Sequence, residues 1–316
     1  MRPVLLVLAV AVLSGLPVEA HSDRGPFSGQ KALEHTKALV GLGPRTPGSP
    51  GHQAAQKYII RQLRLGYNEV EEVEFVASTP AGLRPMKNII GKIPGRSRDI
   101  IVLAGHYDTK TLAGFVGAND GGSSTGLLLE LARVLGRRQP LPVPVWVVFF
   151  DGEEAFRTFT KTDGLFGSRY QANRWARDGV LPRIRALLLV DMIGDKHLNL
   201  RRDANSTRWL TDMIWRLAEE KGHGEHFLDE VTAIEDDHVP FVRAGVPAID
   251  LIDLDFGPGN GYWHTTADTL DKLSAESFHV IGEVVLAAVK QLSGRWPGPE
   301  RWPTAKKPSS SKPPDK

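Results

Sequence analysis

Four apolar segments of the sequence each lead into acidic residues or histidine. The side chains that stand out are His106, Asp120, Glu153, Glu154, Asp191 and His264. Carboxylates that gather at one place raise each other's pKa unless a cation compensates their charge. Carboxylate and imidazole ligands without any thiolate suit a catalytic zinc ion, which takes three protein ligands and keeps one position open. The pattern therefore predicts a zinc-dependent enzyme.

Glu153 and Glu154 directly follow the apolar segment 143–150, so they leave a buried strand together. Adjacent side chains on an extended segment point in different directions. One carboxylate can therefore bind a metal while its neighbour faces the substrate as a general acid or base. A single aspartate near a strand end is more often a cap or a loop residue, and we expect Asp108 and Asp195 to be structural.

A rival motif lies at residues 122–126, whose sequence GSSTG matches the G-x-S-x-G nucleophile elbow of serine hydrolases. That elbow needs a strand running straight into it. Here the preceding residues 117–121 (GANDG) are typical of a loop. We therefore interpret the stretch as the start of a helix rather than as a nucleophile.

The predicted site needs a scaffold whose strands end at one edge. Continuous apolar runs, which are typical of strands buried on both faces, occur at 100–104, 143–150, 186–190 and 246–252. Apolar residues with helical spacing occur at 31–42, 53–65, 124–135, 168–175, 207–220 and 275–292. Strands alternating with helices predict one α/β domain, with a mixed, mostly parallel central sheet and helices on both faces. Ligands bind beyond the carboxyl ends of such strands.

Two further segments complete the expected scaffold. Residues 69–76 alternate between apolar and polar and, with 88–93, predict an antiparallel pair at one edge of the sheet. Residues 43–51, rich in glycine and proline, predict a rigid loop between the first two helices.

The ends of the chain differ from its centre. Residues 1–20 combine an early arginine, a short apolar run and a small-x-small sequence, which predicts a signal peptide and a secreted or periplasmic protein. Residues 21–296 would form the catalytic domain. Residues 297–316 are rich in proline, serine and lysine and predict a disordered tail.

Composition excludes several classes of protein. The chain has 316 residues, 41% of them hydrophobic, and a net charge of +2, which gives no reason to expect a nucleic acid partner. No stretch of about 20 apolar residues after the leader predicts a membrane span in the mature chain. The chain contains no cysteine, so disulfides cannot stabilise it. We expect a monomer.

The ordered set of motifs resembles the zinc-dependent exopeptidases of the co-catalytic aminopeptidase type. Within that superfamily it is most similar to the glutaminyl cyclases, which convert N-terminal glutamine to pyroglutamate. The stretches that carry this closer match are Pro47–Gly51, His106–Lys110, Phe149–Phe156, Asp236–Phe241 and Trp263–Thr265. The resemblance covers about residues 31–292, nearly the whole mature chain.

The resemblance implies a role for each site residue. One zinc ion would be held by Asp120, Glu154 and His264, with Glu153 as the general acid and base. Asp191 and Asp236 would form a hydrogen-bond network beside it, and the substrate pocket would be lined by Trp263, Ile234 and Phe159. Phe159 stands where animal members have a tryptophan, and the cysteine pair of animal members is missing here. Peptide or protein N-termini would be the substrate.

Two alternatives remain open on the sequence alone. His106 and Asp191 can complete a second zinc site bridged by Asp120, which would make the protein a two-zinc aminopeptidase that hydrolyses N-terminal residues. The third possibility is an inactive homologue that only binds peptides. Trp263 before His264 and the run Asp236–His238 favour the cyclase.

Overall fold

The computed structural model describes residues 26–66, 68–138 and 140–294. The predicted signal peptide (1–20) and the predicted tail (297–316) lie outside the described residues. None of the described helices combines the length and the apolar character that crossing a lipid bilayer requires.

From β3 onwards, most strands of the described chain are followed by an α-helix. The strands are β1 (Glu69–Thr79), β2 (Gly82–Ile93), β3 (Ile100–His106), β4 (Val145–Phe150), β5 (Ile184–Asp191), β6 (Leu200–Asp203), β7 (Phe227–Thr232) and β8 (Ala248–Ile252). The α-helices are α1 (Gly29–Val40), α2 (Pro50–Leu65), α3 (Gly122–Gly136), α4 (Phe166–Arg177), α5 (Arg208–Lys221), α6 (Val239–Arg243) and α7 (Ala275–Leu292).

The main sheet has the order β1-β2-β4-β3-β5-β8. Strands β4, β3, β5 and β8 run parallel to one another, whereas β2 pairs antiparallel with both β1 and β4. The prediction of a mixed, mostly parallel sheet with an antiparallel pair at its edge is therefore confirmed. Strands β6 and β7 form a separate parallel pair.

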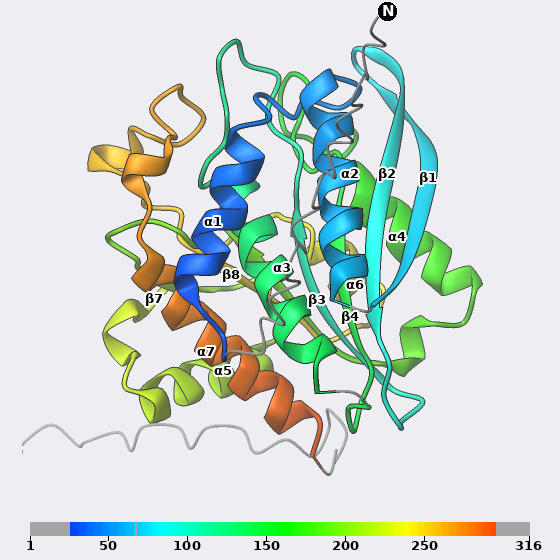
Figure 1. Ribbon diagram of the computed structural model, residues 1–316, viewed down its shortest axis with the longest axis vertical. Coiled ribbons are helices and arrows are strands. Elements are labelled where there is room, and N and C mark those ends of the chain that lie inside the picture. The colour runs from blue at the N-terminus through cyan, green and yellow to red at the C-terminus, as the bar shows by residue number, and fades with distance from the viewer. Residues whose placement is uncertain (1–25, 67, 139, 295–316) are drawn as a thin grey trace, which may run out of the picture.

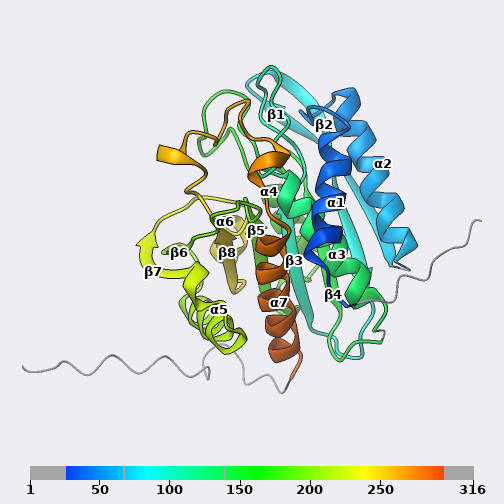
Figure 2. The same cartoon turned by 60° about the vertical axis from the view of Figure 1, so that its left-hand side comes forward.

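Helices cover both faces of the main sheet (Figures 1 and 2). Side chains of α1, α2, α3, α5 and α7 share one hydrophobic core with half of the sheet residues. A second core contains residues of α4 and α6. Every residue of β3 is buried, because alternate side chains enter the two cores. This two-sided burial explains the continuous apolar runs.

Some elements differ from the prediction. The loop predicted over 43–51 is shorter than expected, because α2 already begins at Pro50. Ser49 caps this helix by accepting a hydrogen bond from the backbone of His52, and proline is well suited to the first helical position. The short elements β6, β7 and α6 have no counterpart among the predicted elements.

The topology brings the ends of four strands to one edge. Because β3, β4, β5 and β8 are parallel, their last residues (His106, Phe150, Asp191 and Ile252) lie on the same side of the sheet. The loops that follow these strands therefore meet there, as the sequence predicts.

Candidate metal centre

Two groups of potential metal ligands meet at this edge and share Asp120. One consists of Asp120, Glu154 and His264, and the other of His106, Asp120 and Asp191; the ligand atoms within each group lie within 4.8 Å of one another. The structure thus brings together all five residues that the sequence analysis considered as ligands.

The two carboxylate oxygens of Asp120 face different partners. Its Oδ2 lies 3.2 Å from Nε2 of His264, and that same nitrogen lies 3.3 Å from Oε1 of Glu154. Its Oδ1 lies 3.3 Å from Nε2 of His106, which lies 3.2 Å from Oδ1 of Asp191. Asp120 therefore stands between two possible cation positions.

The pKa values of His264 and Glu154 in the first group are shifted by their neighbours. Burial alone would lower the pKa of His264, but the hydrogen-bonded carboxylates of Asp120 and Glu154 outweigh burial and raise that pKa to about 9. Burial raises the pKa of Glu154, and the charge of Asp120 raises it further. Two buried carboxylates at this distance require a positive charge between them.

The backbone around these ligands is held by two other aspartates. The carboxylate of Asp268 accepts hydrogen bonds from the backbone nitrogens of Asn119, at 2.7 Å, and Asp120, at 3.1 Å. The carboxylate of Asp108 accepts from the backbone nitrogens of Glu153, at 3.1 Å, and Glu154, at 3.3 Å. Both aspartates are fully buried. Asp108 has the structural position that we expected, and Asp268 was not predicted.

Arg45 is a second contributor that sequence reasoning missed. Its guanidinium is fully buried and donates to the backbone oxygens of Tyr107, Val116 and Gly117 at 2.8, 2.7 and 2.8 Å. It thereby holds the loop between β3 and Asp120. In the sequence, the only sign of this role is that Arg45 stands between the pairs Gly-Pro and Thr-Pro.

Glu153 lies beside the first group of ligands. Its pKa is raised well above the ordinary value, chiefly by burial, and the charges of Asp236 and Glu154 add to the effect against the opposing charge of His106. A carboxyl group whose pKa is raised towards the working pH can take up a proton as a base and give it back as an acid.

Asp191 and Asp236 belong to the same electrostatic group. Oδ1 of Asp191 accepts hydrogen bonds from Oγ of Ser124, at 3.2 Å, and from the backbone of Met192, at 2.8 Å. Burial and the charge of Asp191 raise the pKa of Asp236 to about 7. Within the described chain Oδ2 of Asp236 has no hydrogen-bond partner, so charge rather than a direct hydrogen bond couples it to Glu153.

The predicted pocket residues differ in their exposure. Trp263 is 37% exposed and its ring stacks on His264, with the ring centroids 4.1 Å apart. Phe159 is also exposed, on the loop between β4 and α4. Ile234 is half-buried against the main core. Lys110 was not predicted, and its Nζ lies 3.2 Å from Oε2 of Glu154.

The structure gives no support to a serine nucleophile at residues 122–126. These residues are the first turns of α3, whereas β3 already ends at His106, so no strand enters the stretch directly. The hydroxyl of Ser124 donates to Asp191 and is buried. The interpretation as a helix start is confirmed.

Comparisons with known proteins place this geometry in a family. The profile of peptidase family M28 matches residues 88–289. The glutaminyl-peptide cyclotransferase-like protein of Bos taurus is 31% identical over 86% of this chain and 82% of its own length. The crystal structure of Acidobacteriales bacterium glutaminyl cyclase is 42% identical, with a TM-score of 0.83 over 89% of this chain and 100% of that one.

A zinc-dependent exopeptidase from Parabacteroides distasonis shares the fold with a TM-score of 0.74 and 27% identity, over 86% of this chain and 100% of that one. Fold and similarity thus agree over most of the chain. The protein belongs to peptidase family M28, and within it to the group that contains the glutaminyl-peptide cyclotransferases.

Proposed function

We propose that the protein is a zinc-dependent glutaminyl-peptide cyclotransferase, which converts the N-terminal glutamine of a peptide into pyroglutamate and releases ammonia. The observation that carries this proposal is the group Asp120, Glu154 and His264 with Glu153 directly beside it. The similarity to cyclotransferases over most of the chain supports the choice of reaction.

The donor atoms of this group fit a zinc ion. Oδ2 of Asp120 and Oε1 of Glu154 are buried and have no hydrogen-bond partner within the described chain. Both oxygens lie beside Nε2 of His264, so two carboxylates and one imidazole converge, as at catalytic zinc sites. When bound, zinc supplies a Lewis acid that polarises the γ-amide carbonyl of the substrate.

The hydrogen bonds of the ligand oxygens also favour one zinc ion over two. In the second group, Oδ1 of Asp191 faces His106 but already accepts two hydrogen bonds, from Ser124 and from the backbone of Met192. Neither this oxygen nor Oδ1 of Asp120 belongs to the buried oxygens that lack a partner. The oxygen of Asp191 that faces His106 is thus already engaged within the chain, which supports a single zinc ion at the first group.

Glu153 would move the proton in this reaction. The α-amine nitrogen of the substrate attacks its own γ-carbonyl carbon, and the new C–N bond closes a five-membered ring. Glu153 takes a proton from that amine and passes it to the amide nitrogen, whose bond to carbon breaks as ammonia leaves. Attack within one molecule needs no water, so the remaining task of the chain is orientation.

Other residues would bind the substrate or influence the protonation of Glu153. The exposed ring of Trp263, held against His264, offers an apolar wall for the substrate, and Ile234 and Phe159 extend the proposed pocket. The charge of Asp236 opposes the charged form of Glu153, and the charge of Asp191 in turn raises the pKa of Asp236. We further propose export of the protein, on the basis of residues 1–20.

Zinc titration tests the proposal against the two-zinc aminopeptidase. Metal is removed from the purified protein with a chelator, and cyclisation of a glutamine-initiated peptide is followed as zinc is added back. We expect the activity to saturate at about one zinc per chain, because one group of ligands is open. Saturation at two zinc ions per chain, with hydrolysis of the peptide, would support the aminopeptidase instead.

A further inference from the structure

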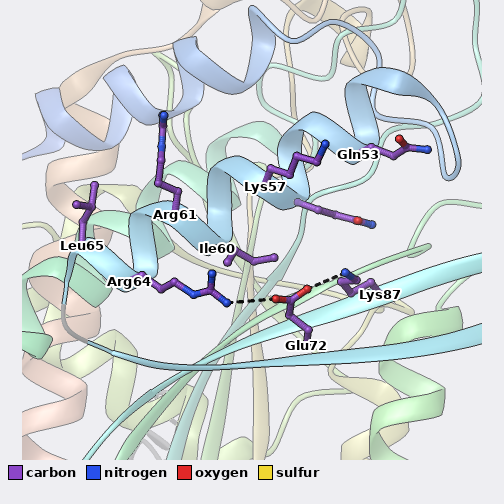
Figure 3. Close-up of a pocket in the computed structure, with 9 residues that line it drawn as sticks. Gln53, Lys57, Ile60, Arg61, Arg64, Leu65, Glu72 and Lys87 are labelled. Carbon is purple, nitrogen blue, oxygen red and sulfur yellow. Dashed lines mark hydrogen bonds and ion pairs between the residues drawn. The ribbon is translucent and has the colours of Figure 1, made fainter.

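A groove lies between α2 and the hairpin of β1 and β2 (Figure 3). Its volume is about 710 Å³, within the range of ligand sites. The residues that line it are Gln53, Gln56, Lys57, Ile60, Arg61, Arg64, Leu65, Glu72 and Lys87. No proposed metal ligand or catalytic residue is among them, and we refer to this feature as the α2 groove.

The α2 groove carries an excess of positive charge. Four of its lining residues are cations and only Glu72 is acidic. Glu72 is shared between Arg64, at 3.4 Å, and Lys87, at 2.7 Å, as the dashed lines of Figure 3 show. Among the described residues, Lys57 and Arg61 have no carboxylate within ion-pair distance. The positive charge of these two side chains is therefore available to a ligand.

The spacing of Lys57 and Arg61 along α2 is close to the repeat of an extended peptide. Lys57, Arg61 and Arg64 lie four and three residues apart on one side of α2, which separates them by about 6 Å and about 4.5 Å along the helix axis. Alternate side chains of an extended chain point the same way and lie about 6.6 Å apart. Carboxylates at every second position of a strand can therefore face successive cations.

Beyond the ion pair of Lys87 with Glu74, at 3.1 Å, the same face of the hairpin carries two exposed apolar side chains. Val76 and Leu83 are 64% and 69% exposed. Leu83 and Lys87 lie on the same face of β2, because they are four residues apart. Val76 of β1 pairs with Pro85, which lies on that face too. Exposed apolar residues beside a charged groove are typical of an interaction surface.

We propose that the α2 groove and the adjoining Val76 and Leu83 bind an extended acidic segment of a partner protein. Alternate aspartate or glutamate residues of the segment face Lys57 and Arg61, and an apolar residue of the segment packs on the hairpin. We infer an acidic partner from charge complementarity, because a groove with an excess of positive charge attracts carboxylates and repels basic chains.

A binding titration tests this proposal without any turnover. A fluorescent peptide with alternating glutamates followed by leucines is acetylated at its N-terminus, so that it cannot be cyclised, and its anisotropy is measured against the full chain. We expect saturable binding that weakens as salt is added, because the attraction is electrostatic. The double variant Lys57→Glu with Arg61→Glu should weaken binding at least about 100-fold, since each attraction becomes a repulsion.

Matched variants show whether the surface is specific. Lys37→Glu reverses one exposed charge on α1, outside the α2 groove, and should leave the affinity almost unchanged. Val76→Ser with Leu83→Ser should weaken binding about tenfold through lost apolar contact. All these positions are exposed, and circular dichroism confirms that each variant is folded.

Three results would overturn the proposal. The first is no binding of the acidic peptide at low ionic strength. The second is equal binding by the wild type and the Lys57/Arg61 double variant. The third is an oligonucleotide of equal charge that binds more tightly than the peptide and displaces it, which would assign the groove to nucleic acid. A failure of cyclisation activity leaves this test unaffected, because the peptide is not a substrate.

Discussion

Replacing Asp108 by asparagine tests how the protein holds its two central glutamates. The buried carboxylate of Asp108 accepts one hydrogen bond from the backbone of Glu153 and one from that of Glu154. Asparagine has nearly the same shape, but its amide nitrogen cannot accept either hydrogen bond. At least one hydrogen bond to a charged acceptor is lost, which is worth about 1.5–3 kcal/mol. At about 1.4 kcal/mol per factor of ten, this corresponds to about 10–100-fold.

We expect most of this loss to appear at the metal centre. The Asp108→Asn variant should bind zinc about 10–100-fold more weakly, as is typical when a residue that orients a metal ligand is changed. Competition against a chromophoric chelator measures that affinity. The value of kcat for a glutamine-initiated peptide should fall even at saturating zinc, because Glu153 is no longer held in place.

Asp163→Asn is the matched control for this substitution. The carboxylate of Asp163 accepts hydrogen bonds from the backbone of Phe156, Arg157 and Thr158, at 2.8, 2.9 and 3.2 Å. It holds the neighbouring loop but no proposed ligand. This control should lower the free energy of unfolding and leave zinc affinity unchanged. If Asp108→Asn likewise lost only stability, our explanation of Asp108 would be refuted.

Three other predictions concern the proton carrier, the pocket and a site outside both. Glu153→Gln should reduce kcat by about 10²–10⁴-fold while zinc content stays the same, and an unchanged kcat would refute the role of Glu153. Trp263→Ala should raise KM more than it lowers kcat, whereas an unaltered KM would remove Trp263 from the pocket. His35 has a pKa of about 4 in the folded protein, mainly because it is largely removed from solvent and also because Arg133 and Lys31 are near. Since this value lies below that of the unfolded chain, the unfolded state binds the proton more readily, and stability should fall as pH drops from about 6.5 towards 4. The free energy of unfolding, measured by chemical denaturation, should change across this pH range by about 1–3 kcal/mol less in His35→Gln than in the wild type. An identical pH dependence in the two proteins would contradict this explanation.

The buried strands were the most predictable part of the fold. Strands β3 and β5 read as continuous apolar runs because both of their faces are covered, and the predicted segments 100–104 and 186–190 fall inside them. Strands β6 and β7 left no such signal. They are short, and each carries charged residues, so only tertiary contacts decide their conformation.

The ligands were predictable for a related reason. Carboxylates and histidine that directly follow parallel strands must meet at one edge, which places Glu154 and Asp191 at the same edge of the sheet without further information. Asp268 and Arg45 were not predictable in this way, because both act on backbone atoms. Hydrogen bonds to the backbone depend on how loops fold, and the residue types alone do not reveal their partners.

The number of zinc ions shows where the structure adds most. The sequence offered five ligands for two sites, so the ligand count alone could not decide between one zinc ion and two. Among the candidate ligands in the described chain, the buried oxygens without a partner are those of Asp120 and Glu154 that face His264, whereas Asp191 is engaged by Ser124 and the backbone. The hydrogen bonds of the folded protein therefore favour one site.

Product analysis tests the central claim most directly. The zinc-loaded protein is incubated with a peptide that begins with glutamine, and ammonia, free amino acid and peptide length are measured in the same sample. The proposed cyclotransferase predicts one ammonia per peptide consumed, an N-terminal pyroglutamate and an unchanged number of residues. Free glutamine together with a peptide shortened by one residue would contradict the account and identify an aminopeptidase.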